Sequence, residues 1–172
     1  MVIDEGVQAL TPKTLAADKR RELLLAFLYK FADTPNVQQR IIGRYWDRAT
    51  AEQRTAYLKL LDEYVVLSYE DDFKNFGADE HIDIQNAEAI DGKIVVHSLD
   101  IDPLDPPPSR VDWVLVTGPK GFKVTDALVD GVSLIATLSE DFQSILRNNG
   151  GKIDGLLDVM RAKIAQLKTT KN

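Results

Sequence analysis

The stretch HIDIQNAEAIDGKIVVHSLDI, residues 81–101, decides the fold class. At its centre Asp91-Gly92 stands between two segments of strand-like composition, residues 82–90 and 93–101. An Asp-Gly pair adopts the positive φ angles of the tight turn that matches the twist of two antiparallel strands. These residues therefore predict a β-hairpin.

Two more strands are predicted on the C-terminal side of this hairpin. A proline-rich connection over residues 103–108 leads to a strand-like segment at 110–117, and the turn at 118–121 leads to another at 122–129. Strands that follow one another through short links form an antiparallel meander. The sequence thus predicts four sequential strands in one sheet.

Helix signals precede the sheet. The pair Thr11-Pro12 has the residue types that start a helix, and apolar residues then recur at helical spacing as far as Phe31. Because this segment is apolar over much of its circumference, we expect a buried helix. A second start signal is Thr34-Pro35, and residues 50–53 form a capping box for a third helix, with residues 70–72 as its solvated end.

Helix signals also follow the sheet. Ser139 is expected to cap a helix that ends at Asn149-Gly150-Gly151, and Asp154 is expected to start a final amphipathic helix. Helices, then a sheet, then helices predict a layered α+β domain.

Length and composition bound the function. A chain of 172 residues has the length of one domain, which we expect to span residues 1–172. Its composition, with 44% hydrophobic and 28% charged residues, is ordinary for a globular protein. The net charge of −6 is the wrong sign for a nucleic-acid binder, and without a heptad seam we expect a monomer. The absence of cysteine excludes disulfides and thiolate metal sites.

Neither a membrane span nor a secretion signal is predicted. The longest strongly apolar run, residues 23–31, is interrupted by Lys30 and is far shorter than the ~20 residues that cross a bilayer. The N-terminus has no basic segment followed by an apolar one. We expect residues 1–12 to be flexible.

Chemical motifs are sparse. The histidines, His81 and His97, belong to no pattern with a nucleophile or metal ligands, and the carboxylates at 100–105 lack the pattern of a calcium loop. The sequence therefore predicts no catalytic residue, no metal and no cofactor.

Asp126 is the one unusual ionisable residue, because it lies in a mostly apolar strand and alternation puts it on the face of Val124 and Leu128. Without hydrogen bonds, burial would raise the pKa of this carboxyl and suit it to general-base work. Structural hydrogen bonding to a neighbouring loop is the favoured interpretation.

Four groups of segments stand out along the chain. They are IGRYW (42–46) with ATAEQR (49–54), YVVLSY (64–69), FKVTD (122–126) with DGVSL (130–134), and FQSIL (142–146) with IDGL (153–156). In their order and spacing over residues 20–167, they resemble the MlaC family, also called the toluene-tolerance family, of periplasmic phospholipid-binding proteins.

The resemblance implies a twisted four-stranded antiparallel sheet wrapped by six or seven helices, with an apolar cavity between them for phospholipid tails. It implies a soluble periplasmic carrier whose signal peptide has been removed, and no enzyme. The implied partners are an outer-membrane lipoprotein–porin complex and an inner-membrane ABC transporter with an MCE-domain ring. Thr125 stands where the family usually has Tyr, and the acidic, proline-rich link at 100–108 is a second departure.

The resemblance raises the expectation that apolar side chains line the cavity, and it implies structural roles for Asp126 and Gly131. The expected lining residues are Ile41, Ile42, Tyr45, Trp46, Tyr57, Leu61, Tyr64, Val65, Tyr69, Val96, Trp113, Leu115, Val124, Val132, Leu134, Phe142, Ile145 and Leu146.

Two alternatives stay open. One is a carrier of another lipid, such as a hopanoid or sterol. The other is a small enzyme in which Asp126 and a tyrosine act in an apolar pocket.

Overall fold

The computed structural model describes residues 10–12, 14–77, 79–119 and 121–170. These residues form five α-helices and one 3₁₀ turn, fewer than the six or seven helices expected. The helices are α2 (Ala17–Phe31), α3 (Thr34–Ile42), α4 (Ala51–Asn75), α5 (Leu134–Asn148) and α6 (Ile153–Thr170), with the 3₁₀ turn η1 (Gly43–Tyr45) between α3 and α4.

The sheet has five antiparallel strands in sequential order, one more than expected. They are β1 (His81–Ile90), β2 (Lys93–Ile101), β3 (Ser109–Gly118), β4 (Gly121–Val129) and β5 (Val132–Ser133). The meander and its first four strands are therefore confirmed almost residue for residue.

Two of the hairpins have an Asp-Gly turn between their strands. Asp91 and Gly92 have φ angles of 49° and 75°, and Ile90 pairs with Lys93, as the sequence predicted. Asp130 and Gly131 form a second turn of the same kind, with φ angles of 48° and 84°. That second turn folds the two residues of β5 back on β4, which is why the sheet gains a fifth strand.

The capping box at the start of α4 is confirmed. Thr50 Oγ1 accepts a hydrogen bond from the backbone N–H of Gln53, and Gln53 Oε1 accepts one from the N–H of Thr50. Two other predicted starts are wrong. The helix that runs to Phe31, α2, begins at Ala17 rather than after Thr11-Pro12. Ser133 rather than Ser139 caps α5, by accepting from Ala136 N at 2.9 Å.

The expected flexible segment 1–12 lies mostly outside the described residues. Within it, Leu10 is fully buried, and its carbonyl accepts a hydrogen bond from Arg20 Nε at 2.9 Å. Arg20 Nη2 also donates to the carbonyl of Pro12 at 2.8 Å. The side chain of Arg20 thus fastens these residues to α2.

The end of α4 is not the solvated terminus that was expected. Glu70 is 5% exposed and forms an ion pair with Arg21 of α2, whose Nη2 lies 3.0 Å from Glu70 Oε1. The paired guanidinium compensates for burying the carboxylate, so the charge lies inside the helix packing. The helix then continues to Asn75.

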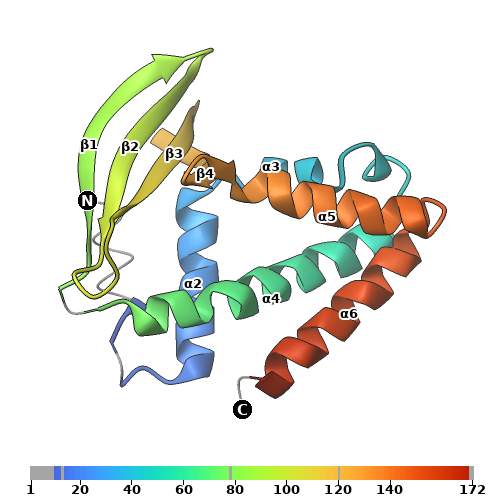
Figure 1. Ribbon diagram of the computed structural model, residues 1–172. Coiled ribbons are helices and arrows are strands. Elements are labelled where there is room, and N and C mark those ends of the chain that lie inside the picture. The colour runs from blue at the N-terminus through green and yellow to red at the C-terminus, as the bar shows by residue number, and fades with distance from the viewer. Residues whose placement is uncertain (1–9, 13, 78, 120, 171–172) are drawn as a thin grey trace.

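The helices contain the close-packed core. A large apolar cluster joins α3, η1, α4, α5 and α6, and a smaller one joins Leu10, Leu24 of α2 and Val66 of α4. Figure 1 shows α4 crossing in front of α2 and running beside α6, with the sheet standing to one side of this layer. Among the described residues, neither cluster includes a residue of the sheet.

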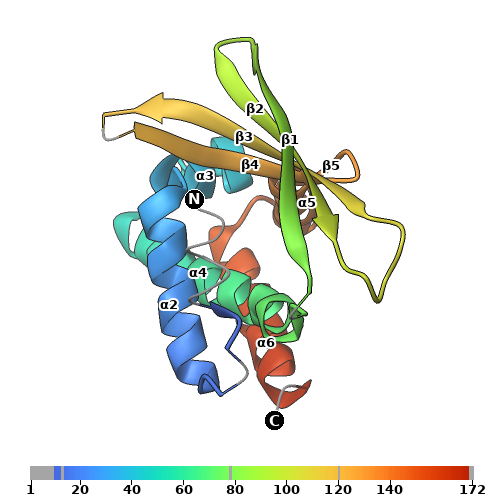
Figure 2. The ribbon, with the colours of Figure 1, turned by 90° about the vertical axis from the view of Figure 1, so that its left-hand side faces the viewer.

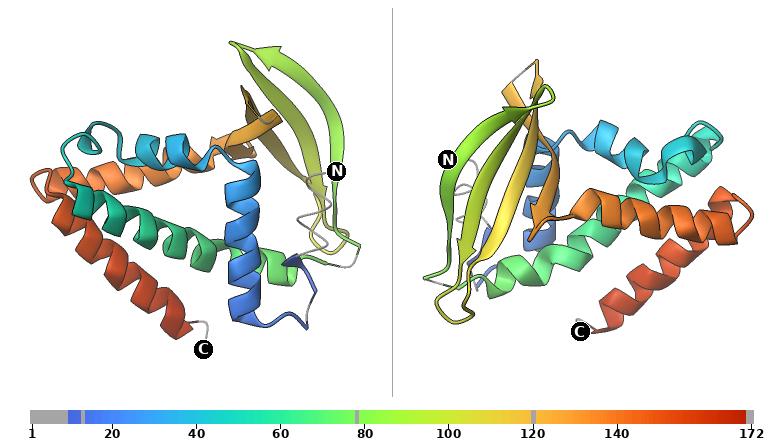
Figure 3. Two further views of the ribbon diagram at one scale, coloured as in Figure 1. Left: turned by 180° about the vertical axis from the view of Figure 1, so that it is seen from behind. Right: turned by 45° about the horizontal axis from the view of Figure 1, so that its top comes forward.

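The sheet is fastened to the helices along β4. This strand packs against α2, α3 and α5, and Asp33 N donates to Val124 O at 2.8 Å where Ala32 pairs with Val124. The strand order places β1 at the other edge of the sheet, and Figure 2 shows the β1–β2 and β3–β4 hairpins splaying apart. Figure 3 shows the same arrangement from behind.

Candidate functional site

An apolar face of the sheet brings together four of the predicted lining residues. Val96 pairs with Trp113, and Leu115 pairs with Val124 in the neighbouring row. Directly paired residues lie on the same face, and residues two apart along a strand do too. All four side chains are half-buried. We refer to this surface, with the three isoleucines named below, as the apolar sheet face.

Sequence reasoning missed three members of this face. Ile82 and Ile84 of β1 pair with Asp100 and Ser98, and Ile94 of β2 pairs with Leu115, which places all three isoleucines on the same side. The three isoleucines are half-buried. The alternation of Ile82 and Ile84 in the first strand was the signal that could have identified two of them.

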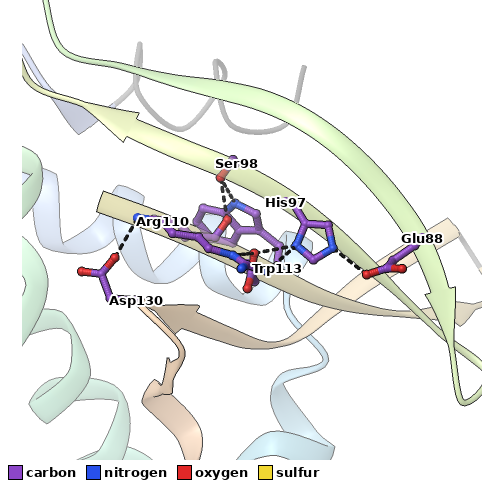
Figure 4. Close-up of polar contacts among 8 residues, drawn as sticks. Glu88, His97, Ser98, Arg110, Trp113 and Asp130 are labelled. Atoms are coloured by element: carbon purple, nitrogen blue, oxygen red, sulfur yellow. Dashed lines mark hydrogen bonds and ion pairs between the residues drawn. The ribbon is translucent and has the colours of Figure 1, made fainter. Parts of the chain in front are cut away.

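Trp113 is held so that its ring contributes apolar surface. Its indole Nε1–H donates to Ser98 Oγ at 3.0 Å, and Ser98 Oγ–H donates to the carbonyl of Val111 at 2.8 Å (Figure 4). Ser98 is 1% exposed. Because the polar N–H already has its partner, the indole can meet a hydrocarbon without leaving a donor unsatisfied.

The apolar sheet face is not close-packed against the helices. Its half-buried residues belong to neither core cluster of the described chain, and Val111 is the only buried hydrophobic residue among the described strands. Interiors normally pack at crystal-like density, so apolar surface left outside such packing marks a ligand or partner site. The face could therefore accept an apolar ligand.

Most predicted lining residues from the helices lie elsewhere, in the large core cluster. Tyr57 is fully buried, and its hydroxyl donates to Gln38 O at 2.9 Å; burial raises the pKa of this phenol well above its usual value. That these side chains also line a ligand cavity stays a prediction. The buried members are Ile41, Ile42, Tyr45, Tyr57, Leu61, Phe142 and Leu146, and those packed against them are Trp46, Tyr64, Val65 and Ile145.

The remaining three predicted residues belong neither to the apolar sheet face nor to the large core cluster. Tyr69 of α4 is 37% exposed and Val132 of β5 is 60% exposed, whereas Leu134 at the start of α5 is half-buried.

A β-bulge corrects the predicted orientation of Asp126. Val114 pairs with Asp126, but the next residue, Leu115, pairs with Val124, so Thr125 is the extra residue of β4. One extra residue reverses the side to which later side chains point. Asp126 and Leu128 therefore lie on the face opposite to Val124, and not on the same face as the strand alternation suggested.

Asp126 joins the end of the sheet to α5. Its carboxylate accepts hydrogen bonds from Ser133 Oγ at 2.6 Å, from Ala127 N at 2.9 Å and from Ile135 N at 3.3 Å. Ser133 in turn caps the helix, and Gly131 forms the turn between them. Thr125, at the bulge, donates from Oγ1 to the carbonyl of Val114 at 3.2 Å.

A charged network crosses the opposite face of the sheet (Figure 4). His97 of β2 lies 2.7 Å from Asp112 of β3 through Nδ1 and 2.9 Å from Glu88 of β1 through Nε2. Arg110 Nε also donates to Asp112 at 2.9 Å. The hydrogen bonds to Asp112 and then Glu88 raise the pKa of His97. The network ties three strands together.

A separate open groove of about 700 Å³ lies between α2, α4 and α6. Its floor is Leu25, Val66 and Leu67, and its other lining residues are charged or ion-paired, such as Glu63 with Lys168. One lining carboxylate, Asp62, accepts hydrogen bonds from Tyr29 and Gln38, and burial raises its pKa. The narrow apolar floor makes this groove a weaker candidate than the sheet face.

In the part of the chain that the structure describes, no group of three or more His, Asp or Glu side chains could hold a metal ion. No helix among the same residues is long and apolar enough to cross a bilayer.

The fold and the sheet face define a class: α+β proteins whose antiparallel sheet keeps an apolar face outside the helical core. The model of the family described as MlaC protein matches residues 2–162, and the chain belongs to that family. Its fold is similar to that of a phospholipid-binding protein from Ralstonia solanacearum, solved in complex with a phospholipid. The two share 22% identity with a TM-score of 0.86, over 97% of this chain and 94% of the other.

Proposed function

We propose that this protein is a lipid carrier that binds the acyl chains of a phospholipid against the apolar sheet face. The observation that carries the proposal is the set of half-buried apolar side chains on β1 to β4 that belong to neither core cluster of the described residues. Removing an acyl chain from water contributes about 0.8 kcal/mol per CH₂, which supplies the driving force. The phospholipid held by the similar Ralstonia solanacearum protein supports this ligand class.

We also propose a cellular role, which the family match supports. The protein would act as a soluble carrier in the periplasm that shuttles lipid between an outer-membrane lipoprotein–porin complex and an inner-membrane ABC transporter that carries an MCE ring. Each of these partners is part of the proposal.

Binding rather than catalysis also agrees with the ionisable groups. The carboxylate of Asp126 is engaged by Ser133 and by two backbone N–H groups, and His97 is held between two carboxylates. In the described structure, both groups serve as hydrogen-bonding partners within the fold. We therefore propose that the protein is not an enzyme.

The first experiment is mass spectrometry of an organic extract of the purified protein. A phospholipid in stoichiometric amount would support the proposal. A sterol or hopanoid would replace it with carriage of a ring lipid, and an extract without lipid would contradict both.

The second experiment places a charge on either side of one strand. Val95 and Val96 are neighbouring half-buried valines of β2 that point to opposite faces of the sheet. Val96→Glu places a carboxylate among the proposed acyl chains and should empty the site, whereas Val95→Glu, the matched control, should stay loaded. Equal lipid content in both folded variants would refute the assignment to the apolar sheet face.

A further inference from the structure

Positive charge is concentrated at the end of the helical layer, in two segments, residues 40–54 and 147–154. The two segments hold six cations and three carboxylates, a net +3, in a chain whose total is −6, so the rest of the chain carries −9. We call these two segments the basic end. Its cations are Arg40, Arg44, Arg48, Arg54, Arg147 and Lys152.

The cations of the basic end are not neutralised locally. Within the described residues, none of the six forms an ion pair, whereas cations elsewhere do, such as Lys19 with Glu22 and Arg161 with Asp158. Five of the six are exposed, and Arg54 is half-buried. Their charge is therefore directed at whatever approaches this end.

Aromatic rings hold three of the guanidinium groups in place. Arg44 and Arg48 lie over the ring of Tyr45, with their Cζ atoms 5.3 and 6.0 Å from its centroid. Arg54 lies 5.1 Å from the Trp46 ring and donates from Nε to the carbonyl of Trp46 at 3.0 Å. Cation–π contacts of this kind pre-order the side chains that would meet a ligand.

The two segments form one surface because Tyr45 joins them. Tyr45 is 4% exposed, and a Cβ added at Gly151, in the turn between α5 and α6, would lie 3.3 Å from its ring. Figure 1 shows this turn and the connection from α3 to α4 at the same end of the helices, away from the sheet. The basic end is thus a protruding tip, separate from the apolar sheet face.

We propose that the basic end docks on an anionic phospholipid bilayer through the phosphates of its headgroups. Arginine matches phosphate oxygens with paired N–H donors, and clusters of four to eight cations are typical of anionic-lipid surfaces. None of the large exposed apolar residues belongs to the two segments, so the apolar centre of a protein–protein interface is missing. A lipid bilayer can also bind a protruding tip, because its surface does not need a shape complementary to that of the protein.

Sedimentation with vesicles tests the proposal without reference to bound cargo. Wild type should sediment with vesicles of phosphatidylglycerol and phosphatidylcholine in equal parts, but not with phosphatidylcholine alone. Arg40→Gln, Arg147→Gln and Lys152→Gln combined should weaken the binding about 100-fold, since each cation contributes about a factor of five at an anionic surface. In the described structure, these three side chains make no hydrogen bond or ion pair, so the variant should fold.

The control removes the same charge elsewhere. Lys59→Gln, Lys93→Gln and Arg161→Gln combined give the same net charge from exposed positions outside the basic end and should bind like wild type. Raising the salt concentration from ~0.05 M to ~0.5 M should release wild type from the vesicles, because the Debye length shortens and the attraction between the cations and the lipid phosphates is screened.

Two results would overturn the proposal. One is equal weakening in both triple variants, which would assign binding to overall charge. The other is no binding of wild type to phosphatidylglycerol vesicles at low salt, which would leave an acidic protein surface as the partner of the basic end.

Discussion

A single carboxylate, that of Asp126, sets how the sheet continues into α5. It accepts hydrogen bonds from the N–H of Ala127 within β4, and from the hydroxyl of Ser133 and the N–H of Ile135 in the segment that follows β4. Strand alternation places this residue on the wrong face, because the bulge at Thr125 reverses the orientation. Sequence periodicity carries no signal for one extra residue in a strand.

Asp126→Ala should lower the free energy of unfolding by about 1 to 3 kcal/mol, because it leaves the half-buried donors of Ser133, Ala127 and Ile135 without their acceptor. Urea denaturation measures the loss. Asp105→Ala, a change of the same type at an exposed loop position whose side chain makes no hydrogen bond in the described structure, provides the comparison. An Asp126→Ala protein that unfolds at the wild-type midpoint would show that the network is dispensable.

His97 should make stability depend on pH. Its pKa is raised in the folded state by Asp112 and Glu88, so protonation favours folding. This contribution is complete below the unfolded pKa of about 6.5 and is lost as the pH rises through the raised pKa. Denaturation from about pH 5 to about pH 9 should show a steeper decline for wild type than for His97→Gln. Parallel curves would contradict it, and His81→Gln controls for loss of an imidazole.

At the scale of elements, strands were easier to derive than helix ends. The Asp91-Gly92 turn determines the register of β1 and β2 beside it, so Ile90 lies opposite Lys93 and Ala89 lies opposite Ile94. The turn at Asp130-Gly131 has the same chemistry, but the two residues of β5 that follow it were too few to suggest a strand. Serine caps are ambiguous because Ser133 and Ser139 both precede apolar residues at helical spacing.

The junction of α5 and α6 reverses the usual effect of a glycine in a helix. Gly→Ala in a helix interior normally stabilises by about 1 kcal/mol. A Cβ at Gly155 would lie 2.8 Å from Cβ and Cγ of Asn149, which ends α5. Gly155→Ala should therefore lower the midpoint of urea unfolding. A rise would show that Asn149 can move aside, and Ala165→Gly at an exposed site calibrates the propensity of α6.

At the scale of the molecule, packing density divides the protein into a helical core and a sheet outside it. Because of this division, the members of the candidate site on the sheet could be predicted from the sequence, whereas those on the helices could not. Val96, Trp113, Leu115 and Val124 share a face because hairpin register follows from sequence. Apolar stripes on helices predict a core and a cavity wall equally well, so Leu61 and its neighbours could not be assigned.

Hydrogen exchange should reveal the same division. After lipid is removed, amides of β2 and β3 should exchange faster than those of α4 to α6, because few close-packed contacts hold the sheet. Reloading with phospholipid should slow exchange in β2 and β3 and leave the helical core unchanged. Protection that rises only in the helices would place the ligand away from the sheet.

The attachment along β4 has a mechanical consequence. A plate clamped along one margin bends most at the opposite margin, so β1 should travel furthest when the sheet yields, while the clamp at Ala32 and Val124 stays still. A small rotation of the sheet about this attachment changes the space beneath the whole sheet. Ligands of different width can then be accommodated without disturbing the helices. The range of ligand sizes that the protein accepts would then depend on how rigidly the contacts of His97 with Glu88 and Asp112 hold β1, β2 and β3 together.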